Sequence, residues 1–190
     1  MFRSGLALWM VCGSFLCINA NAEQLITEKE AIHKVFPGST VTEQVDICLS
    51  AEGILRVEKE AHIVFNEGNS ARVAYREVKN EEKVIGSIVV DSVQGRWGPI
   101  KFLMGVDRAG VVVGVVVLEH KEVRGKPIVK QRFLKQYLGK TSKDPVRVQK
   151  DIDGVTGATV SSRALTDGVR KDLFILKESL TSADQGACKM

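Results

Sequence analysis

The run from Asp153 to Ser162 (Asp-Gly-Val-Thr-Gly-Ala-Thr-Val-Ser-Ser) combines a glycine-rich turn with several hydroxyl side chains. Because glycine lacks a Cβ, Gly154 and Gly157 let the backbone take positive φ angles and approach a ligand closely. Hydroxyl groups can donate hydrogen bonds to phosphate oxygens or cap a following helix. The hydroxyl side chains in the run are Thr156, Thr159, Ser161 and Ser162. This composition predicts a phosphate attachment site, with the phosphate at Thr159.

A helix is expected directly after this run. Apolar residues recur there at helical spacing, namely Leu165, Val169, Leu173 and Leu176. The N–H groups in the first turn of a helix have no acceptor within the helix, and the helix dipole favours an anion at that end. The predicted helix start therefore supports the same phosphate site.

The spacing Asp-x-x-Thr-Gly-Ala-Thr over residues 153–159 resembles a known signature. It is similar to the Asp-x-x-Ser/Thr-Gly-Ala-Thr motif of the FMN-binding domain in peripheral subunits of the sodium-pumping NADH:quinone reductase and the Rnf electron-transport complex. In that family a flavin transferase joins the FMN phosphate to the last threonine through a phosphoester bond. The resemblance thus implies covalent FMN on Thr159. It also implies roles in recognition or binding for Asp153, Thr156, Gly157, Ala158, Ser161 and Ser162.

Simpler interpretations of the same run compete with this one. A segment rich in Gly, Thr and Ser before an amphipathic helix is often only a loop with an N-cap. A Walker phosphate loop does not fit, because no lysine follows the glycines at the required spacing. A calcium loop starting at Asp151 is disfavoured as well, since Ser162 occupies the position that requires a glutamate.

The family resemblance extends over roughly residues 84–176. It includes the segment from Gly95 to Asp107, the hairpin that follows, and the sequence Glu-His-Lys-Glu at 119–122. At 123–126 this chain has Val-Arg-Gly-Lys, where the family commonly has Thr-Pro-Gly-Leu. The ring contacts that the family would make there are therefore not expected, whereas attachment at Thr159 is unaffected.

Two further side chains are candidates for contact with the flavin. The indole of Trp97 offers a planar apolar surface that could cover one flavin face, although a Trp before a strand also serves as a core residue. His120 could donate to the flavin or relay a proton, or it could be an ordinary surface or hydrogen-bonded residue at a strand end. The sequence leaves both alternatives open.

Residues 1–22 have the pattern of a secretory signal peptide. Arg3 precedes an uncharged apolar stretch, and Ala20-Asn21-Ala22 matches the small-residue cleavage pattern, so cleavage after Ala22 and export are expected. An uncleaved anchor is the alternative. Loss of Arg3 would lower the formal charge from +4 to +3, and this mild imbalance gives no case for nucleic-acid binding.

Two cysteines, Cys48 and Cys188, follow the leader. Their spacing matches no metal, haem or dithiol redox motif, and a disulfide between them is one possibility in an oxidising compartment.

The remaining pattern predicts an α+β fold, with an antiparallel sheet or half-barrel, flanking helices and a small N-terminal extension. Thr27 to Glu30 reads as a capping box that opens a short helix. Strands are expected at 61–65, 72–78, 84–90, 101–106 and 111–118, and a helix at about 129–138 that ends at Gly139. The second strand of the hairpin, 111–118, is apolar on both faces and is expected to be central and covered on both sides. The predicted organisation is a leader at 1–22, leading elements at 23–83, an FMN-binding core at 84–176 and a tail at 177–190.

These observations predict an exported flavoprotein that carries covalent FMN and relays electrons between redox partners at the membrane. The expected partners are a flavin transferase for maturation and membrane or exported electron-transfer proteins. The sequence offers no catalytic triad, paired-carboxylate motif or metal cluster, so no catalytic or metal residue is assigned. The alternatives are a module that binds flavin or another phosphorylated ligand without a covalent bond, and an assembly factor for a redox complex.

Overall fold

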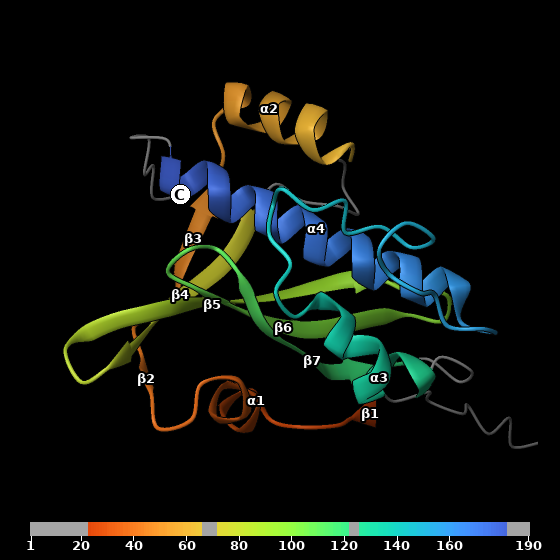
Figure 1. Ribbon diagram of the computed structural model, residues 1–190, viewed down its shortest axis with the longest axis horizontal. Helices are drawn as coiled ribbons and strands as arrows, with labels where there is room; N and C mark the ends of the chain where they lie inside the picture. The colour runs from red at the N-terminus through yellow and green to blue at the C-terminus, as the bar shows by residue number, and fades with distance from the viewer. Residues whose placement is uncertain (1–22, 66–71, 122–125, 182–190) are drawn as a thin grey trace, which may run out of the picture.

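The computed structural model describes residues 23–65, 72–121 and 126–181, and it has the expected α+β architecture (Figure 1). Its elements are β1 (Glu23–Gln24), α1 (Glu28–Val35), β2 (Thr40–Val41), β3 (Val45–Cys48), α2 (Ala51–Ala61), β4 (Arg72–Asn80), β5 (Lys83–Gln94), β6 (Pro99–Asp107), β7 (Val112–His120), the 3-10 helix η1 (Lys126–Val129), α3 (Gln131–Leu134), the 3-10 helix η2 (Lys135–Tyr137) and α4 (Thr159–Thr181).

The strands form one curled antiparallel sheet in the order β1-β7-β6-β5-β4-β2, with β3 pairing β4 beside β2. The long hairpins β4–β5, β5–β6 and β6–β7 make up its centre. The turn between β6 and β7 is the predicted one: Gly110 has φ 76°, and the Asp107 carboxylate accepts hydrogen bonds from the N–H groups of Ala109 and Val111. The predicted hairpin is therefore confirmed.

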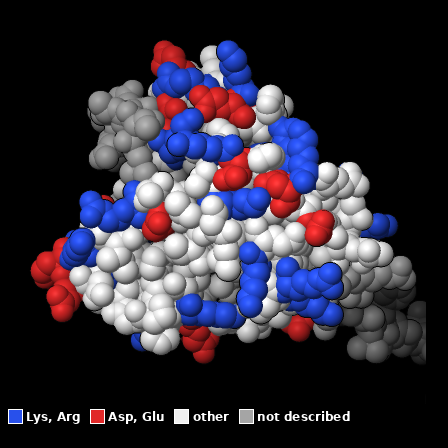
Figure 2. Space-filling model, viewed as in Figure 1, with Lys and Arg blue, Asp and Glu red and all other residues white. Residues whose placement is uncertain are grey.

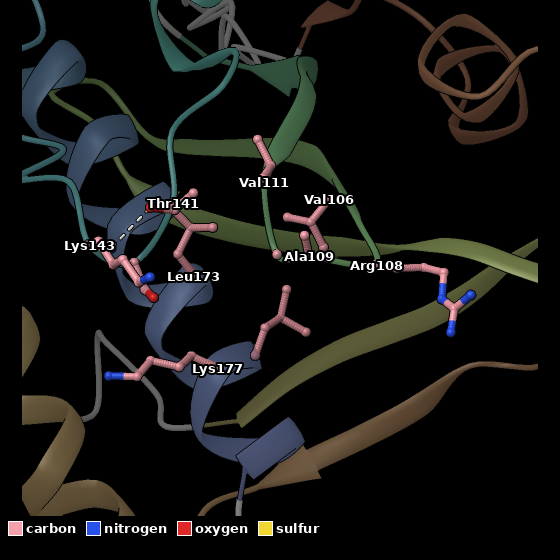
Figure 3. A pocket seen from close by; sticks show the side chains of 11 residues that line it. Val106, Arg108, Ala109, Val111, Thr141, Lys143, Leu173 and Lys177 are labelled. Carbon is pink, nitrogen blue, oxygen red and sulfur yellow. Dashed lines mark hydrogen bonds between the residues drawn. The ribbon is translucent and has the colours of Figure 1, made fainter.

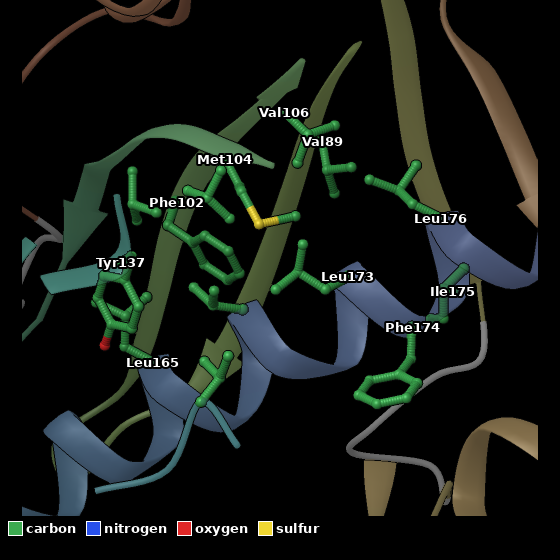
Figure 4. Packing of buried hydrophobic residues seen from close by; sticks show 14 of the residues in the cluster. Val89, Phe102, Met104, Val106, Tyr137, Leu165, Leu173, Phe174, Ile175 and Leu176 are labelled. Carbon is green, nitrogen blue, oxygen red and sulfur yellow. The ribbon is translucent and has the colours of Figure 1, made fainter. Parts of the chain in front are cut away.

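Helices cover both faces of the sheet. On one face α4 packs across the sheet and α2 lies outside it, whereas α1 lies on the opposite face (Figure 1). The main core lies between α4 and the sheet, where Phe102 and Met104 meet Leu165 and Leu173 (Figure 4). A smaller cluster under α1 includes Leu103 and is separate from the main core.

Close contact between α4 and the sheet depends on Gly168. A Cβ at this position would lie 2.5 Å from the Cγ1 of Val93 and 3.2 Å from the ring of Phe102. Any larger residue would force this part of α4 away from β5 and β6. The absence of a side chain thus sets how deeply the helix sits.

The N-terminal helix follows the capping prediction. The hydroxyl of Thr27 accepts from the N–H of Glu30, and the Glu30 carboxylate accepts from the N–H of Thr27. These reciprocal bonds satisfy two N–H groups that the helix itself leaves without partners.

Three local predictions need correction. Residues 61–65 are not a strand, because Ala61 ends α2 and the chain continues without strand structure. The helix expected at 129–138 is divided into η1, α3 and η2. The extended backbone of Lys130, with ψ 138°, separates η1 from α3, and α3 then continues directly into the tighter turn η2. The strand β7 is covered on both faces as expected. It is not at the centre of the sheet, however, because its outer edge pairs only with the two-residue β1.

None of the helices in the described part of the chain is both long and apolar enough to cross a membrane.

Candidate functional site

The predicted attachment residue is the first residue of α4. Gly157 has φ 80°, a left-handed conformation that suits glycine, and it turns the chain into the helix. The carbonyl of Ala158 accepts the first helical hydrogen bond, from the N–H of Ser162, at 2.8 Å. Asp153, Thr156 and Thr159 are exposed, so the Thr159 hydroxyl is accessible to another molecule.

The start of α4 is not capped by the protein. Ala158 precedes the helix and has no side-chain acceptor, and the first turn of α4 contains no acidic residue. Within the described ranges, the N–H groups of Thr159, Val160 and Ser161 have no protein acceptor. Three free donors at the positive end of a 23-residue helix form a site that favours an anion, and the attachable hydroxyl lies among them.

The two serines of the motif face the interior. Ser161 is almost completely buried and Ser162 is completely buried. The Ser162 hydroxyl donates to the carbonyl of Ala158 at 2.9 Å and accepts from the N–H of Val155 at 3.1 Å. Ser162 therefore holds the motif loop against the helix, and its role as a ligand contact stays a prediction.

A second clamp joins the motif to η2. The Gln136 side chain accepts from the N–H of Asp153 at 2.7 Å and donates to the Asp153 carbonyl at 3.2 Å. Next to Gln136, the Tyr137 hydroxyl is 2.8 Å from that of Thr166, which donates to the Ser162 carbonyl. Burial raises the pKa of Tyr137, so its hydroxyl stays protonated as a structural hydrogen-bonding group.

A hollow of about 470 Å³ opens beside the motif. Its walls are Asp153, Gly154, Val155 and Thr156 on the motif side and Lys130, Arg132, Phe133 and Gln136 on the other. This volume is within the range of organic-ligand sites, roughly 300–1,000 Å³. The two cations would favour an anionic ligand, whereas Phe133, which also lines the hollow, is only 3% exposed.

The two other candidate residues, Trp97 and His120, lie at the end of the sheet where β6 begins and β7 ends. Trp97 lies in the turn between β5 and β6, is 53% exposed and has the Arg96 guanidinium 5.7 Å from its ring centre. Such exposure excludes a core role for its indole. His120 ends β7 opposite Ile100 and is only 1% exposed, so it is not a surface residue.

Sequence reasoning missed Gln136, Lys130 and Arg132 as residues around the motif. They precede the motif by about twenty residues and belong to no recognised motif, so only the fold brings them next to it.

Several expectations lie outside the described residues. These are the leader at 1–22, the departure from the family at Val123 and Arg124, and residues 182–190 of the tail, which include Cys188. The first residues of the predicted tail, 177–181, belong to α4. The side chains of Cys48 and Lys126 are also outside the description, so the disulfide stays a prediction.

Comparison with protein families gives a match over residues 95–173 to the family described as "FMN-binding domain". The matched segment spans less than half of the chain and is similar to an FMN-binding domain. The match supports FMN as the cofactor. The free helix start, the exposed Thr159 hydroxyl and the adjacent hollow fit a ligand with a phosphate at one end and a planar ring at the other.

Two relatives are named as subunits of ion-translocating complexes. The chain is 38% identical over 94 residues to a subunit of the ion-translocating oxidoreductase complex of Aliivibrio fischeri (strain MJ11), covering 44% of this chain and 45% of that protein. It is 23% identical over 166 residues to a subunit of the Na(+)-translocating ferredoxin:NAD(+) oxidoreductase complex of Acetobacterium woodii, covering 83% and 73%. The matches to the proteins from two Aliivibrio fischeri strains thus span about half of their length.

A solved structure shares the fold. A crystal structure of one subunit of the Na(+)-translocating NADH-quinone reductase from Parabacteroides distasonis superposes with a TM-score of 0.54 at 17% identity, covering 84% of this chain and 86% of that one.

Proposed function

We propose that this protein is an exported flavoprotein in which FMN is joined through its phosphate to Thr159 and relays electrons between redox partners at the membrane. The observation that carries the proposal is the arrangement at the start of α4. An exposed hydroxyl lies at a helix terminus with three free N–H groups, in a segment that matches the FMN-binding domain family.

The attachment needs an activated FMN donor and a flavin transferase. The Oγ of Thr159 forms a bond to the FMN phosphorus, the hydroxyl proton leaves, and the phosphorus–oxygen bond to the donor's leaving group breaks. The first-turn N–H groups would then hold the phosphate oxygens, because the helix terminus already favours negative charge. Gly157 allows the close approach of the phosphate, since it leaves space where a side chain would otherwise stand.

Other residues would position the flavin and adjust its environment. FMN supplies the redox chemistry when bound, and the protein supplies placement and electrostatics. Lys130 and Arg132 line the adjacent hollow and would favour negative charge on the ligand. The exposed indole of Trp97 is available at the same end of the sheet to cover an apolar ring face.

The role as an electron carrier between proteins rests on two arguments. No Gly-x-Gly-x-x-Gly fingerprint is present in the sequence, so a pyridine dinucleotide has no evident binding motif. The named relatives are subunits of oxidoreductase complexes, which supports a partner protein as the electron source. The leader pattern supports export to the extracytoplasmic side of the membrane.

The decisive experiment is expression in a host that exports the chain and contains a flavin transferase. After denaturation the wild-type protein should keep its flavin, and peptide mass spectrometry should find the added mass on the peptide that contains Thr159. Thr159→Ala should lose the covalent flavin completely, whereas the exposed Thr40→Ala on β2 should keep it. Covalent flavin in the Thr159→Ala protein would refute the site, and release of flavin from the denatured wild type would refute the covalent bond.

A further inference from the structure

A basic hollow lies beside the middle of α4. It measures about 260 Å³ and opens between the end of α2, the loop after η2 and the middle of α4. Four cationic side chains line it, namely Lys143, Arg147, Lys150 and Arg170. Figure 2 shows Lys and Arg side chains gathered beside the end of α2, where this loop passes.

The positive charge in the basic hollow is only partly balanced by the protein. Two carboxylates also line it, but Glu60 is paired with Lys177 at 2.5 Å. Asp144 accepts two hydrogen bonds from the neutral Thr141 at 2.8 Å each and offsets one of the four positive charges. For Lys143, Arg147 and Lys150, no ion pair occurs with any residue in the described ranges.

Arg170 adds a buried charge behind the hollow. Its side chain is 7% exposed, with Nη2 2.9 Å from the Asp167 carboxylate and Nη1 donating to the Val146 carbonyl at 3.1 Å. Its buried Nε has no hydrogen-bond partner. Burial lowers the pKa of Arg170, and the positive charge of Arg147 acts in the same direction, whereas the carboxylates of Asp167 and Asp151 raise it. Arg147 and Arg170 line the same hollow, so an anion held there would interact favourably with both guanidinium groups.

The loop holds Arg147 in place at a cost in backbone strain. Val146 has φ 41°, an unfavourable conformation for a β-branched residue that costs on the order of 1–3 kcal/mol. The Asp151 carboxylate accepts from the N–H groups of Val146 and Arg147, at 3.2 and 2.8 Å, and pairs with Lys140 at 2.8 Å. This carboxylate satisfies the loop backbone and does not reach the Arg147 side chain as an ion-pair partner.

We propose that the basic hollow is a binding site for a phosphate group, held by Lys143, Arg147 and Lys150 with Arg170 adding charge from behind. Guanidinium groups match the geometry of phosphate oxygens, and lysines supply additional point charges. A hollow of about 260 Å³ has room for a small anion such as phosphate.

This site is distinct from the attachment site. Arg170 lies eleven residues after Thr159 on α4, which corresponds to about 16 Å along the helix axis. The proposal therefore goes beyond the flavin function and does not depend on it.

The phosphate can be inorganic or can belong to a phosphomonoester. The basic hollow shares Ser142 and Lys143 with a neighbouring hollow of about 390 Å³ (Figure 3). Leu173 and Val106 line that second hollow, so it offers an apolar surface to an organic group attached to the phosphate.

The test is calorimetric titration of the purified full chain with inorganic phosphate at constant ionic strength. Wild type should bind phosphate saturably, and Arg147→Gln should weaken binding by about tenfold or more, because a charged hydrogen bond is lost. The exposed Lys150→Gln gives a second measure of the same loss with little risk to folding. Lys83→Gln, at the exposed start of β5, should bind as wild type does.

A parallel titration with phenyl phosphate distinguishes the two sources. Tighter binding of phenyl phosphate than of inorganic phosphate identifies a phosphomonoester site, and equal affinity identifies a site for the free ion. Absence of saturable binding of either probe, or unchanged affinity in both Arg147→Gln and Lys150→Gln, would overturn the proposal.

Discussion

Ser162→Ala removes a single oxygen atom from the interior of the flavin motif. The wild-type hydroxyl joins the loop to the helix by accepting from the N–H of Val155 and donating to the Ala158 carbonyl. In the variant the Ala158 carbonyl keeps its bond from the N–H of residue 162, so only the Val155 N–H loses its partner. The change therefore tests whether the loop conformation itself supports attachment.

The expected loss of stability is modest. An unsatisfied buried donor costs about 1–3 kcal/mol, and the lower end applies because Val155 is only half-buried and water can reach it. Alanine is a better helix former than serine by a few tenths of a kcal/mol, which offsets part of the cost. A net loss of about 1 kcal/mol should lower the Tm by about 2–4 °C for a chain of this size.

The effect on flavin attachment should be larger than the effect on stability. A loop that is no longer tied to α4 presents Thr159 in several orientations, so the fraction of flavinylated protein should fall severalfold when transferase is limiting. Intact-mass spectrometry measures that fraction, and hydrogen exchange at the Val155 amide measures the local opening. Ser179→Ala is the matched control, because Ser179 makes a similar bond to a helix carbonyl, that of Leu176, far from the motif.

Two outcomes would refute this reasoning. If the Ser162→Ala protein shows the same hydrogen exchange at Val155 and the same flavinylated fraction as wild type, the Ser162 hydroxyl does not hold the loop. Loss of flavinylation with unchanged exchange at Val155 would mean that Ser162 contacts the ligand or the transferase directly.

Two further predictions concern pH and electron supply. Burial and the charge of Asp91 raise the pKa of Asp172 well above its usual range, although Lys171 opposes this. The folded state therefore keeps a proton that the unfolded state releases, so the free energy of unfolding should fall as pH rises. Asp172→Asn should flatten this pH dependence and raise the Tm at alkaline pH, as measured by melting curves from about pH 5 to about pH 9. A variant Tm that changes with pH in parallel with that of wild type would contradict the prediction. For the bound flavin, dithionite should reduce it readily and NADH only slowly in anaerobic stopped-flow; rapid, saturable reduction by NADH would indicate an autonomous oxidoreductase.

The sequence predicts the parts of the fold whose apolar pattern is strong. The β6–β7 hairpin and α4 follow directly from their valine runs and helical spacing. The helix α2 gave no such signal, because its buried face consists of Gly53, Val57 and Ala61, whereas the more hydrophobic Leu55 is 65% exposed. Small residues pack well against α4 but contribute little to a hydrophobic pattern, so the helix could not be read from periodicity.

In the candidate site as well, some residues could be predicted from the sequence and others could not. The residues from Asp153 to Thr159 are contiguous, so a motif identifies them, and the structure places Thr159 at a helix start as the sequence predicts. Gln136 holds the same loop through the backbone of Asp153, seventeen residues away. A contact to backbone atoms places no demand on the residue type at position 153, so no pattern in the sequence could reveal it.

The structure also explains why the helix start can stay without a protein cap. A cap on α4 would satisfy its free N–H groups, but it would also occupy the position where an anion binds. Here the loop before α4 is held by Ser162 and Gln136, which lie behind and beside it, and not by an N-cap side chain. Further along, Gly168 fixes the helix against β5 and β6. The terminus is thus held rigidly by contacts that leave its donors open, and this arrangement suits a phosphate that becomes the permanent cap of the helix.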